Sequence, residues 1–290
     1  MPSSRRTRSI KLLIAILSAS ILGAAIFGHA RFRARAQHVY AFEAQAAAEG
    51  AKDADIARGA HLAHTLGGCA KCHGGDLAGK VMSEDATMRL VAPNLTPGRG
   101  SAVRGYRARD WARAIVHGTR PRGTSLLVMP SPELSKLADA DVAAITRYMQ
   151  SLRPVDRELA GSRVSLVGRV VLGLADAPVF SAEGYDHQRS RAAPPEVGPT
   201  RVYGEYMLNM CRGCHGPALQ GGIEIHPGAP PSADISQSVM RKWSWDGFQR
   251  ALREGIGGDG RILDAAMPWQ ATKGLSGDEL RALWLALRGE

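Results

Sequence analysis

The pentapeptide C-x-x-C-H occurs twice in the chain, at 69–73 and 211–215, and the two copies use all four cysteines. In each copy the two thiols can lie on one helical turn, where each can add to one vinyl group of a haem. The adjacent histidine can then bind the iron as the proximal ligand. The pattern therefore predicts two covalently bound c-type haems. The residues expected to hold them are Cys69, Cys72 and His73, and Cys211, Cys214 and His215.

Other interpretations of paired cysteines fit this chain less well. A zinc ribbon places its two cysteine pairs roughly 15–20 residues apart, and the pairs here are much further apart. A thioredoxin-like redox pair lies near a βαβ pattern, and we find none in this sequence. Both copies also place a histidine directly after the second cysteine, which favours haem.

Both motifs lie inside a longer repeat. An aromatic-led helical stretch ends at Gly118 in the first copy and at Gly255 in the second, and Met-Pro follows at 129–130 and 267–268. Such self-similarity indicates two homologous domains. Apolar residues recur at helical spacing and no segment shows convincing strand alternation, so we expect an all-α fold. The expected parts are a basic N-terminus with a membrane anchor at 1–35, a first domain at 51–153, a linker at 154–200 and a second domain at 201–290.

The order of helix, C-x-x-C-H, loop, short helix, Met-Pro and C-terminal helix resembles class I cytochrome c. The stretches 91–97, 110–111 and 129–130 are similar to the multihaem cytochrome c subunits of membrane-bound alcohol, aldehyde and gluconate dehydrogenases. Those subunits typically carry three haems, whereas this chain has motifs for two. The resemblance implies two tandem class I cytochrome c-like haem domains behind an N-terminal transmembrane helix. It also implies that a proline carbonyl accepts a hydrogen bond from each proximal histidine, and Pro93 and Pro230 are the matching positions.

Met129 and Met267 are the candidates for the distal iron ligands. Both precede proline at the same place in the repeat, and His/Met ligation by a soft thioether raises the haem potential. The alternative is that a methionine only fills the core, which suits those on apolar helix faces. Bis-histidine ligation through His117 or His226 would lower the potential instead, but we interpret His117 as a surface residue at a helix end. Minor rivals for the methionine role are Met82, Met88 and Met240.

Two local expectations concern helix ends and the linker. The sequence 276–279 has the form of a capping box before the last helix, and Asp139 is expected to cap the equivalent helix of the first copy. In the linker, the apolar segment 164–174 keeps a helical spacing despite two glycines. We expect this segment to pack across the two haem domains, with contact to the membrane or a partner subunit as the alternative.

The N-terminal sequence is typical of an export and membrane segment. A basic stretch precedes the apolar run 10–27, which is long enough to cross a bilayer as a helix. The small residues at 28 and 30 leave a cleaved signal peptide open, but the length of the run and the arginines after it favour an uncleaved anchor. Since the resembled class attaches its haem outside the bacterial cytoplasm, we expect an inner-membrane protein with its haem domains on the periplasmic side.

Charge is concentrated at the N-terminus. The net charge is +10, and the first 35 residues hold seven basic and no acidic residues, which leaves +3 for the remainder. This distribution gives no indication of nucleic-acid binding. An arginine-rich stretch at 99–122 is either a solvated face or a docking patch for an acidic redox partner.

These features favour an electron-transfer protein with no catalytic residues. The expected partners are redox proteins, either a dehydrogenase subunit or other cytochromes or an oxidase, together with the membrane through the N-terminal helix. The alternative is a dihaem redox enzyme such as a peroxidase, which needs an iron position that opens. Met-Pro in both copies argues against a peroxidase, and a thiosulfate-oxidising cytochrome would need a spare cysteine that the sequence lacks.

Overall fold

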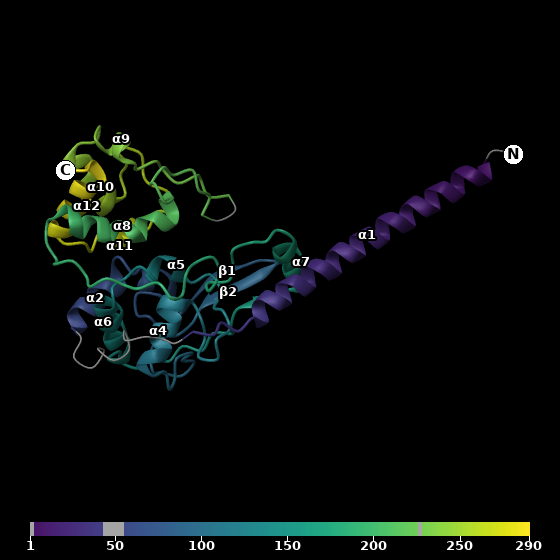
Figure 1. Cartoon of the computed structure of the whole chain (residues 1–290), viewed down its shortest axis with the longest axis horizontal. Helices are drawn as coiled ribbons and strands as arrows, with labels where there is room; N and C mark the ends of the chain where they lie inside the picture. The colour runs from purple at the N-terminus through teal and green to yellow at the C-terminus, as the bar shows by residue number, and fades with distance from the viewer. Residues whose placement is uncertain (1–2, 43–54, 226–227) are drawn as a thin grey trace.

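A computed structural model describes residues 3–42, 55–225 and 228–290. One long helix projects from a body that consists of two lobes (Figure 1). The lower lobe holds the first repeat unit, residues 55–153, and the upper lobe holds the second unit, residues 200–290. The linker between the units packs mainly along the first one. The start of the expected first domain, 51–54, and His226 lie outside the described residues.

In the first unit, two helices cross at a glycine and enclose the core. The helices α2 (Ile56–His64) and α6 (Asp139–Gln150) approach so closely that a Cβ at Gly59 would lie 2.0 Å from the Ala144 carbonyl oxygen. Leu62, Val142 and Ile145 are almost fully buried beside this crossing. The other helices of this unit are α3 (Cys69–His73), α4 (Ala108–His117) and α5 (Ser131–Leu134).

The second unit repeats this crossing. A Cβ at Gly204 would lie 2.0 Å from the Ala282 carbonyl oxygen, where α8 (Arg201–His215) meets α12 (Gly277–Arg288). Here one helix runs through the C-x-x-C-H motif, because no glycine pair interrupts it as residues 67–68 do in the first unit. The remaining helices are α9 (Gln237–Met240), α10 (Trp245–Glu254) and α11 (Trp269–Thr272).

Helix capping differs between the units. As expected, Ser276 and Glu279 form a capping box, in which the Ser276 hydroxyl accepts from the Glu279 amide and Glu279 accepts from the Ser276 amide. The expected cap by Asp139 is wrong. The N-cap residue Ala138 has no side-chain cap, and Asp139 pairs with Arg191 of the linker instead.

The expectation of a strictly all-α fold is wrong, because a small antiparallel sheet flanks the first unit. Strands β1 (Lys80–Glu84) and β2 (Met88–Ala92) form a hairpin, and β3 (Arg163–Val164) from the linker pairs with β2. The Asp85 carboxylate closes the turn by accepting hydrogen bonds from the Thr87 and Met88 amides. The short strands are only half-buried, so no clear alternation of apolar and polar residues marked them in the sequence.

The apolar linker segment does not pack across the two lobes. Its helix α7 (Leu166–Leu174) packs against α1 (Ser3–Gln37), the long N-terminal helix. Residues 8–37 of α1 are long and apolar enough to cross a membrane, and the apolar window is fully exposed. Its last turns enter the body, where Phe32 is buried against Phe180.

A buried polar network joins the two lobes. Asp141 of α6 accepts two hydrogen bonds from the Arg58 guanidinium, at 3.0 and 3.1 Å, and one from the Tyr206 hydroxyl at 2.6 Å. Arg58 also donates to the Tyr203 hydroxyl of α8 at 2.9 Å. Glu279 of α12 lies 2.8 Å from His61 Nε2 of α2. The carboxyl groups of Asp141 and Glu279 are almost fully buried. The lobes are therefore joined by hydrogen bonds to buried charged groups.

Asp141→Ala is expected to lower the free energy of unfolding by about 3 kcal/mol, because it leaves the buried Arg58 charge without its main partner. Denaturant unfolding of the detergent-solubilised holoprotein measures this change. Asp156→Ala is the control. Its carboxyl is 52% exposed and its partner Arg99 is 74% exposed, so removing this ion pair should cost less than about 1 kcal/mol. Equal losses in the two variants would contradict the structural role of the network.

Candidate haem sites

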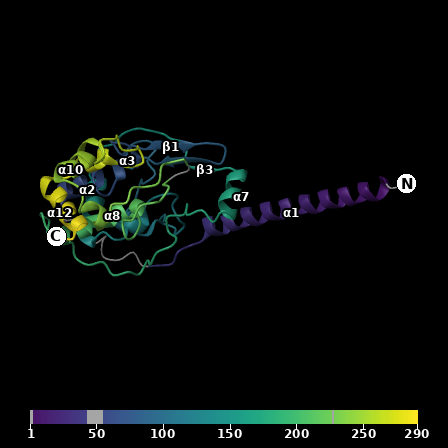
Figure 2. The same cartoon turned by 90° about the horizontal axis from the view of Figure 1, so that it is seen from above.

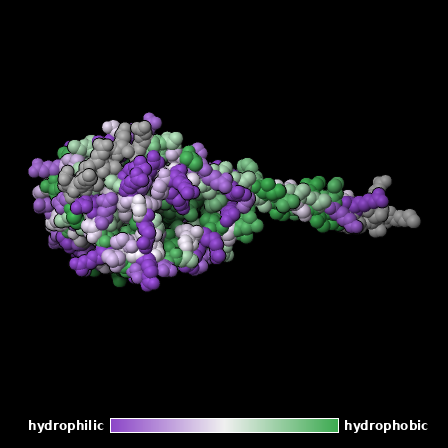
Figure 3. Space-filling model, turned by 90° about the horizontal axis from the view of Figure 1, so that it is seen from below, coloured by the Kyte–Doolittle hydropathy of each residue, from purple (hydrophilic) through white to green (hydrophobic). Residues whose placement is uncertain are grey.

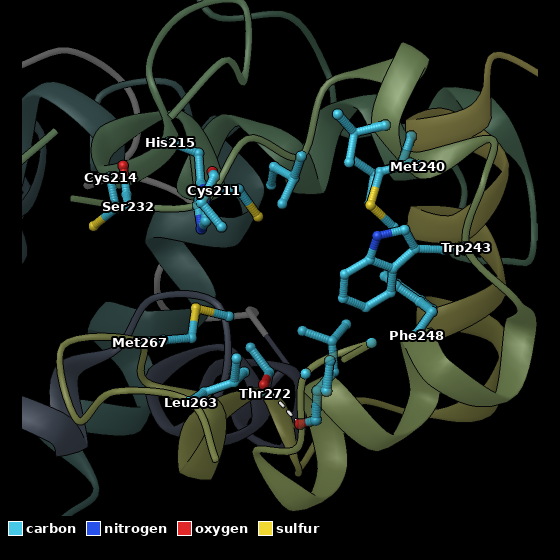
Figure 4. Close-up of a pocket in the computed structure, with 18 of the residues that line it drawn as sticks. Cys211, Cys214, His215, Ser232, Met240, Trp243, Phe248, Leu263, Met267 and Thr272 are labelled. Carbon is cyan, nitrogen blue, oxygen red and sulfur yellow. Dashed lines mark hydrogen bonds between the residues drawn. The ribbon is translucent and has the colours of Figure 1, made fainter. Parts of the chain in front are cut away.

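The second unit contains an open cavity of about 1000 Å³, at the upper end of the size range of ligand pockets. Cys211, Cys214 and His215 line one side, and Met267 lies across the cavity from His215 (Figure 4). Apolar side chains form much of the wall. They include Leu208, Trp243, Phe248, Leu263, Leu275 and Leu283. A large apolar cavity with an imidazole and a thioether on opposite sides fits a flat apolar macrocycle with a central metal.

Each motif histidine is oriented by a backbone carbonyl. His73 Nδ1 lies 2.8 Å from the Pro93 carbonyl oxygen, and His215 Nδ1 lies 2.7 Å from the Ala233 carbonyl oxygen. A ring Nδ1–H that donates to a carbonyl leaves Nε2 as the free nitrogen with a lone pair, which is the form that binds a metal. Burial lowers the pKa of His73, which further favours the neutral imidazole.

The expected carbonyl partner is correct for Pro93 and wrong for Pro230. Ala233 takes the place of Pro93 in the second unit. The amide of Leu95 donates to the Leu77 carbonyl, and the amide of Ile235 donates to the Leu219 carbonyl in the same way. The repeat therefore matches 93–96 with 233–236. Asn94 then corresponds to Asp234, and both side chains accept from an amide two residues later.

The sulfur atoms of the motifs lie in surroundings that disfavour charge. Burial raises the pKa of Cys69 to about 12 and that of Cys211 to about 11. The pKa values of Cys72 and Cys214 are raised by burial as well. A thioether is neutral, so these positions suit sulfur that is bonded to a vinyl-derived carbon. The four cysteines and the apolar cavity therefore fit covalent haem attachment.

The two candidate methionines occupy equivalent places in the fold. Each precedes a proline that caps a short helix, with φ and ψ of −78° and 49° at Pro130 and −81° and 51° at Pro268. Met129 packs against the core of the first unit together with Cys69. Of the rivals, Met82 and Met88 lie on the sheet. Met240 is buried beside Trp243, at the other end of the cavity from His215 (Figure 4).

Three other histidines have structural partners. His61 contacts Glu279, and His64 lies 2.9 Å from the Tyr148 hydroxyl. The interpretation of His117 as a surface residue is wrong, because it is only 3% exposed. Its ring stacks on Phe42, and its Nδ1 lies 3.2 Å from His187 Nδ1. The segment after α1 and the end of the linker cover it, which the repeat could not indicate.

His117 should make stability depend on pH. Burial, with repulsion from His187 and nearby arginines, lowers its pKa from 6.5 to about 4. Between these pH values the unfolded chain binds the proton more tightly, so stability is lost as pH falls from about 6.5 and the loss is complete below about 4. The loss is at most about 3 kcal/mol. Denaturant unfolding at several pH values should show a smaller loss in His117→Asn than in the parent, while His38→Asn at an exposed site keeps it.

Each candidate site contacts the ligand loop of the other unit. Lys71 Nζ, inside the first C-x-x-C-H motif, donates to the Ala266 carbonyl at 3.2 Å, next to Met267. In the opposite direction, Gly213 of the second motif packs on Glu133 of α5, which follows Met129. A Cβ at Gly213 would lie 2.7 Å from the Glu133 Cγ. The two sites are therefore neighbours across the interface between the lobes.

Comparison with known proteins assigns both units. Residues 56–153 match the cytochrome c family, and residues 199–285 match the family described as cytochrome c oxidase, cbb3-type, subunit III. The chain carries two cytochrome c domains. The first domain is the unit with Cys69, Cys72 and His73, and the second is the unit with Cys211, Cys214 and His215.

Curated relatives are cytochrome subunits of dehydrogenases. The chain is 26% identical to the alcohol dehydrogenase (quinone) cytochrome c subunit of Komagataeibacter europaeus, over 87% of this chain and 59% of the relative. It is 27% identical to the Gluconobacter oxydans subunit of the same description, over 81% and 54%. The gluconate 2-dehydrogenase cytochrome c subunit of Pantoea cypripedii is 26% identical over 71% and 49%. The chain thus spans about half the length of these relatives.

Sequence reasoning missed the carbonyl of Ala233 and the network between the cytochrome c domains. The sequence did contain the information that locates Ala233. Residues 94–96 are Asn-Leu-Thr and residues 234–236 are Asp-Ile-Ser, so aligning these similar stretches matches Pro93 with Ala233. The repeated Ala-Pro pairs suggested a different alignment. The sequence contains no such information for the network. Tyr203 and Tyr206 reach Arg58 and Asp141 only when the two domains pack, and their spacing along the chain fits no motif.

Proposed function

We propose that this chain is a membrane-anchored dihaem cytochrome c that carries electrons from a dehydrogenase subunit or another donor to the respiratory chain. Cys69, Cys72, His73 and Met129 would hold one haem, and the equivalent residues of the second domain would hold the other. Each haem supplies a one-electron redox centre when bound. With a methionine opposite the histidine, neither site keeps a position open for a substrate, as a peroxidase would need.

The observation that carries this proposal is the reciprocal contact between the two sites. Lys71 hydrogen-bonds beside Met267, and Gly213 packs on the helix after Met129. This arrangement puts two sites of the same chemistry side by side within one body. The hydrogen bonds from Arg58 to Tyr203 and from Tyr206 to Asp141, with the His61–Glu279 contact, keep the two domains in this arrangement. A carrier that accepts an electron at one site and releases it at the other requires such a fixed separation.

The partner and the location rest on the relatives and on α1. The curated relatives are named as subunits of quinone alcohol and gluconate dehydrogenases, so we propose a dehydrogenase as the electron donor. We further propose that α1 stays uncleaved and spans the bacterial inner membrane, with both domains on the periplasmic side. Phe32, Arg31 and Arg35 support retention of the helix, because all three contact the body just after the apolar run.

Purification from native membranes in mild detergent tests the partnership. We expect a dehydrogenase subunit to copurify in a fixed ratio, and its alcohol, aldehyde or sugar-acid substrate to reduce both haems. If the chain emerges alone and is reduced only by small mediators or other cytochromes, it is a free-standing carrier and the dehydrogenase partnership is wrong. Charge reversal at Arg104 and Arg107 then tests the arginine-rich docking patch, since loss of that patch should slow reduction and flatten its salt dependence.

A further inference from the structure

The linker helix α7 crosses the N-terminal helix at one defined level. A Cβ at Gly173 would lie 1.9 Å from the Gly28 carbonyl oxygen, and a Cβ at Gly28 would lie 2.6 Å from the Val170 carbonyl oxygen. The two backbones are therefore in direct contact. Arg31 Nη1 also donates to the Gly173 carbonyl at 3.3 Å. Figure 2 shows α7 lying across α1 at the end of the body from which α1 projects.

This crossing coincides with the end of the apolar run. The run 10–27 would span about 27 Å as a helix, close to the roughly 30 Å thickness of a bilayer core. Gly28 follows the run directly. Arg31 and Arg35 come next and pair with Asp176 and Glu183 of the segment after α7. If α1 spans the membrane, α7 therefore lies at its surface.

One face of α7 is apolar and strongly exposed. Gly168 packs on the Thr87 carbonyl and Gly173 packs on α1, so these positions face the protein. The exposed fractions are 66% for Leu166, 61% for Val167 and 48% for Val171. Leu174, at the edge of this face, is 46% exposed and also touches α1 at Gly28. Figure 3 shows the hydrophobic surface of α1 continuing onto the adjoining part of the body.

We propose that α7 is an interfacial helix whose face of Leu166, Val167, Val171 and Leu174 lies in the lipid headgroup and acyl boundary. An amphipathic helix in this position buries its apolar face about 5–10 Å into that boundary. The occupant of the face is lipid, because the face adjoins a helix that is itself surrounded by lipid and lies at the level where the bilayer ends. This inference rests on the proposal that α1 is retained and spans the membrane.

A spanning helix and an interfacial helix together would fix the orientation of the haem domains. A single spanning helix leaves the body free to tilt, whereas α7 lying in the membrane plane restricts the tilt. The joint between the helices is stiffened by the ion pairs of Arg31 and Arg35 with Asp176, at 2.8 and 3.2 Å. The body would then present the same side to the membrane at all times.

Spin labels on the full haem-loaded chain in phosphatidylcholine–phosphatidylglycerol nanodiscs test this placement. The native cysteines are expected to be consumed by haem, so a nitroxide reagent attaches to an introduced cysteine only. Val171→Cys and Val167→Cys probe α7, and Ile21→Cys marks the bilayer interior. Val202→Cys is the matched water control, because Val202 is 66% exposed on the second domain. Collision with oxygen reports lipid, and collision with a polar nickel complex reports water.

We expect the labels at 171 and 167 to collide with the nickel complex several-fold less often than the label at 202, and with oxygen more often. If they behave like the label at 202 while the label at 21 lies in lipid, the anchor stands and the α7 proposal is wrong. If the chain has lost residue 21, or if the label at 21 lies in water, the proposal that α1 spans the membrane is wrong. The α7 proposal is then wrong as well. Reduction of the haems is measured separately and decides the electron-transfer proposal.

Discussion

Replacing both Cys211 and Cys214 with serine will leave one covalently bound haem per chain in place of two. The change removes both thioether bonds of the second domain and leaves Cys69 and Cys72 untouched. Since the buried sulfur atoms are the only covalent links expected there, the second haem should be lost under denaturing conditions. Intact mass and the haem absorbance per polypeptide measure the loss.

The converse variant, with Cys69 and Cys72 replaced by serine, should retain only the haem of the second domain. Arg212→Ser is the matched control, because Arg212 lies inside the same motif and its side chain bonds to Glu205, Asn209 and the Pro217 carbonyl. It should keep both haems. Two covalent haems in the first variant would refute the assignment of Cys211 and Cys214.

Met267→His is expected to lower the potential of one haem by roughly a few tenths of a volt, given that axial ligands set haem potentials over about 0.8 V. Replacing a thioether by an imidazole favours the ferric state, so the change is downward. A spectroelectrochemical titration of the full chain should show one wave shifted and the other in place. Met129→His should shift the other wave.

Met240→Leu tests whether Met240 binds the iron or only packs in the cavity wall. Met240 lines the same cavity and is 2% exposed, so a leucine of similar volume should leave both potentials close to those of the parent. A shift in Met240→Leu with none in Met267→His would assign the iron ligand to Met240. Unchanged potentials in all three variants would leave no role for these methionines at the iron.

The sequence predicts those parts of the site that depend on residues close together in the chain. The C-x-x-C-H motifs and the capping box at Ser276 are local patterns, and the structure has the capping box as expected. The Pro93 carbonyl was implied by the resemblance to class I cytochrome c, and the structure has this contact as well. The prediction of the Pro230 carbonyl in place of the Ala233 carbonyl was wrong because the loop of the second domain differs in length. A repeated Ala-Pro pair suggested a false alignment of the two loops. Backbone acceptors do not depend on the side chain they carry, so residue type alone located them poorly.

Features formed by segments that are far apart in the chain could not be predicted from the sequence. β3 completes the sheet from the linker, some seventy residues after β2, and its two residues carry no strand signal. The helical conformation of α7 was predicted correctly, but the prediction that it packs across the two haem domains was wrong. An apolar face indicates that a segment is buried, but it does not identify the segment that packs against it. The burial of His117 by Phe42 and His187 likewise depends on segments outside the repeat.

The network between the domains has an internal symmetry. Arg58 and Tyr203 each precede the glycine of a helix crossing, and they bond to one another. His61 and Tyr206 each lie two residues after that glycine, while Asp141 and Glu279 are each the third residue of their helices. His61 contacts Glu279 as Tyr206 contacts Asp141.

An interface in which one patch meets its own equivalent is the isologous kind that builds two-fold dimers. The chain therefore has the arrangement of a two-fold dimer of cytochrome c domains joined in one polypeptide. A fused dimer holds its partner at a constant effective concentration, so its two domains stay paired however dilute the protein becomes. It also permits each copy to change alone, and the Asn94–Asp234 difference beside the two proximal histidines is one place where they have done so.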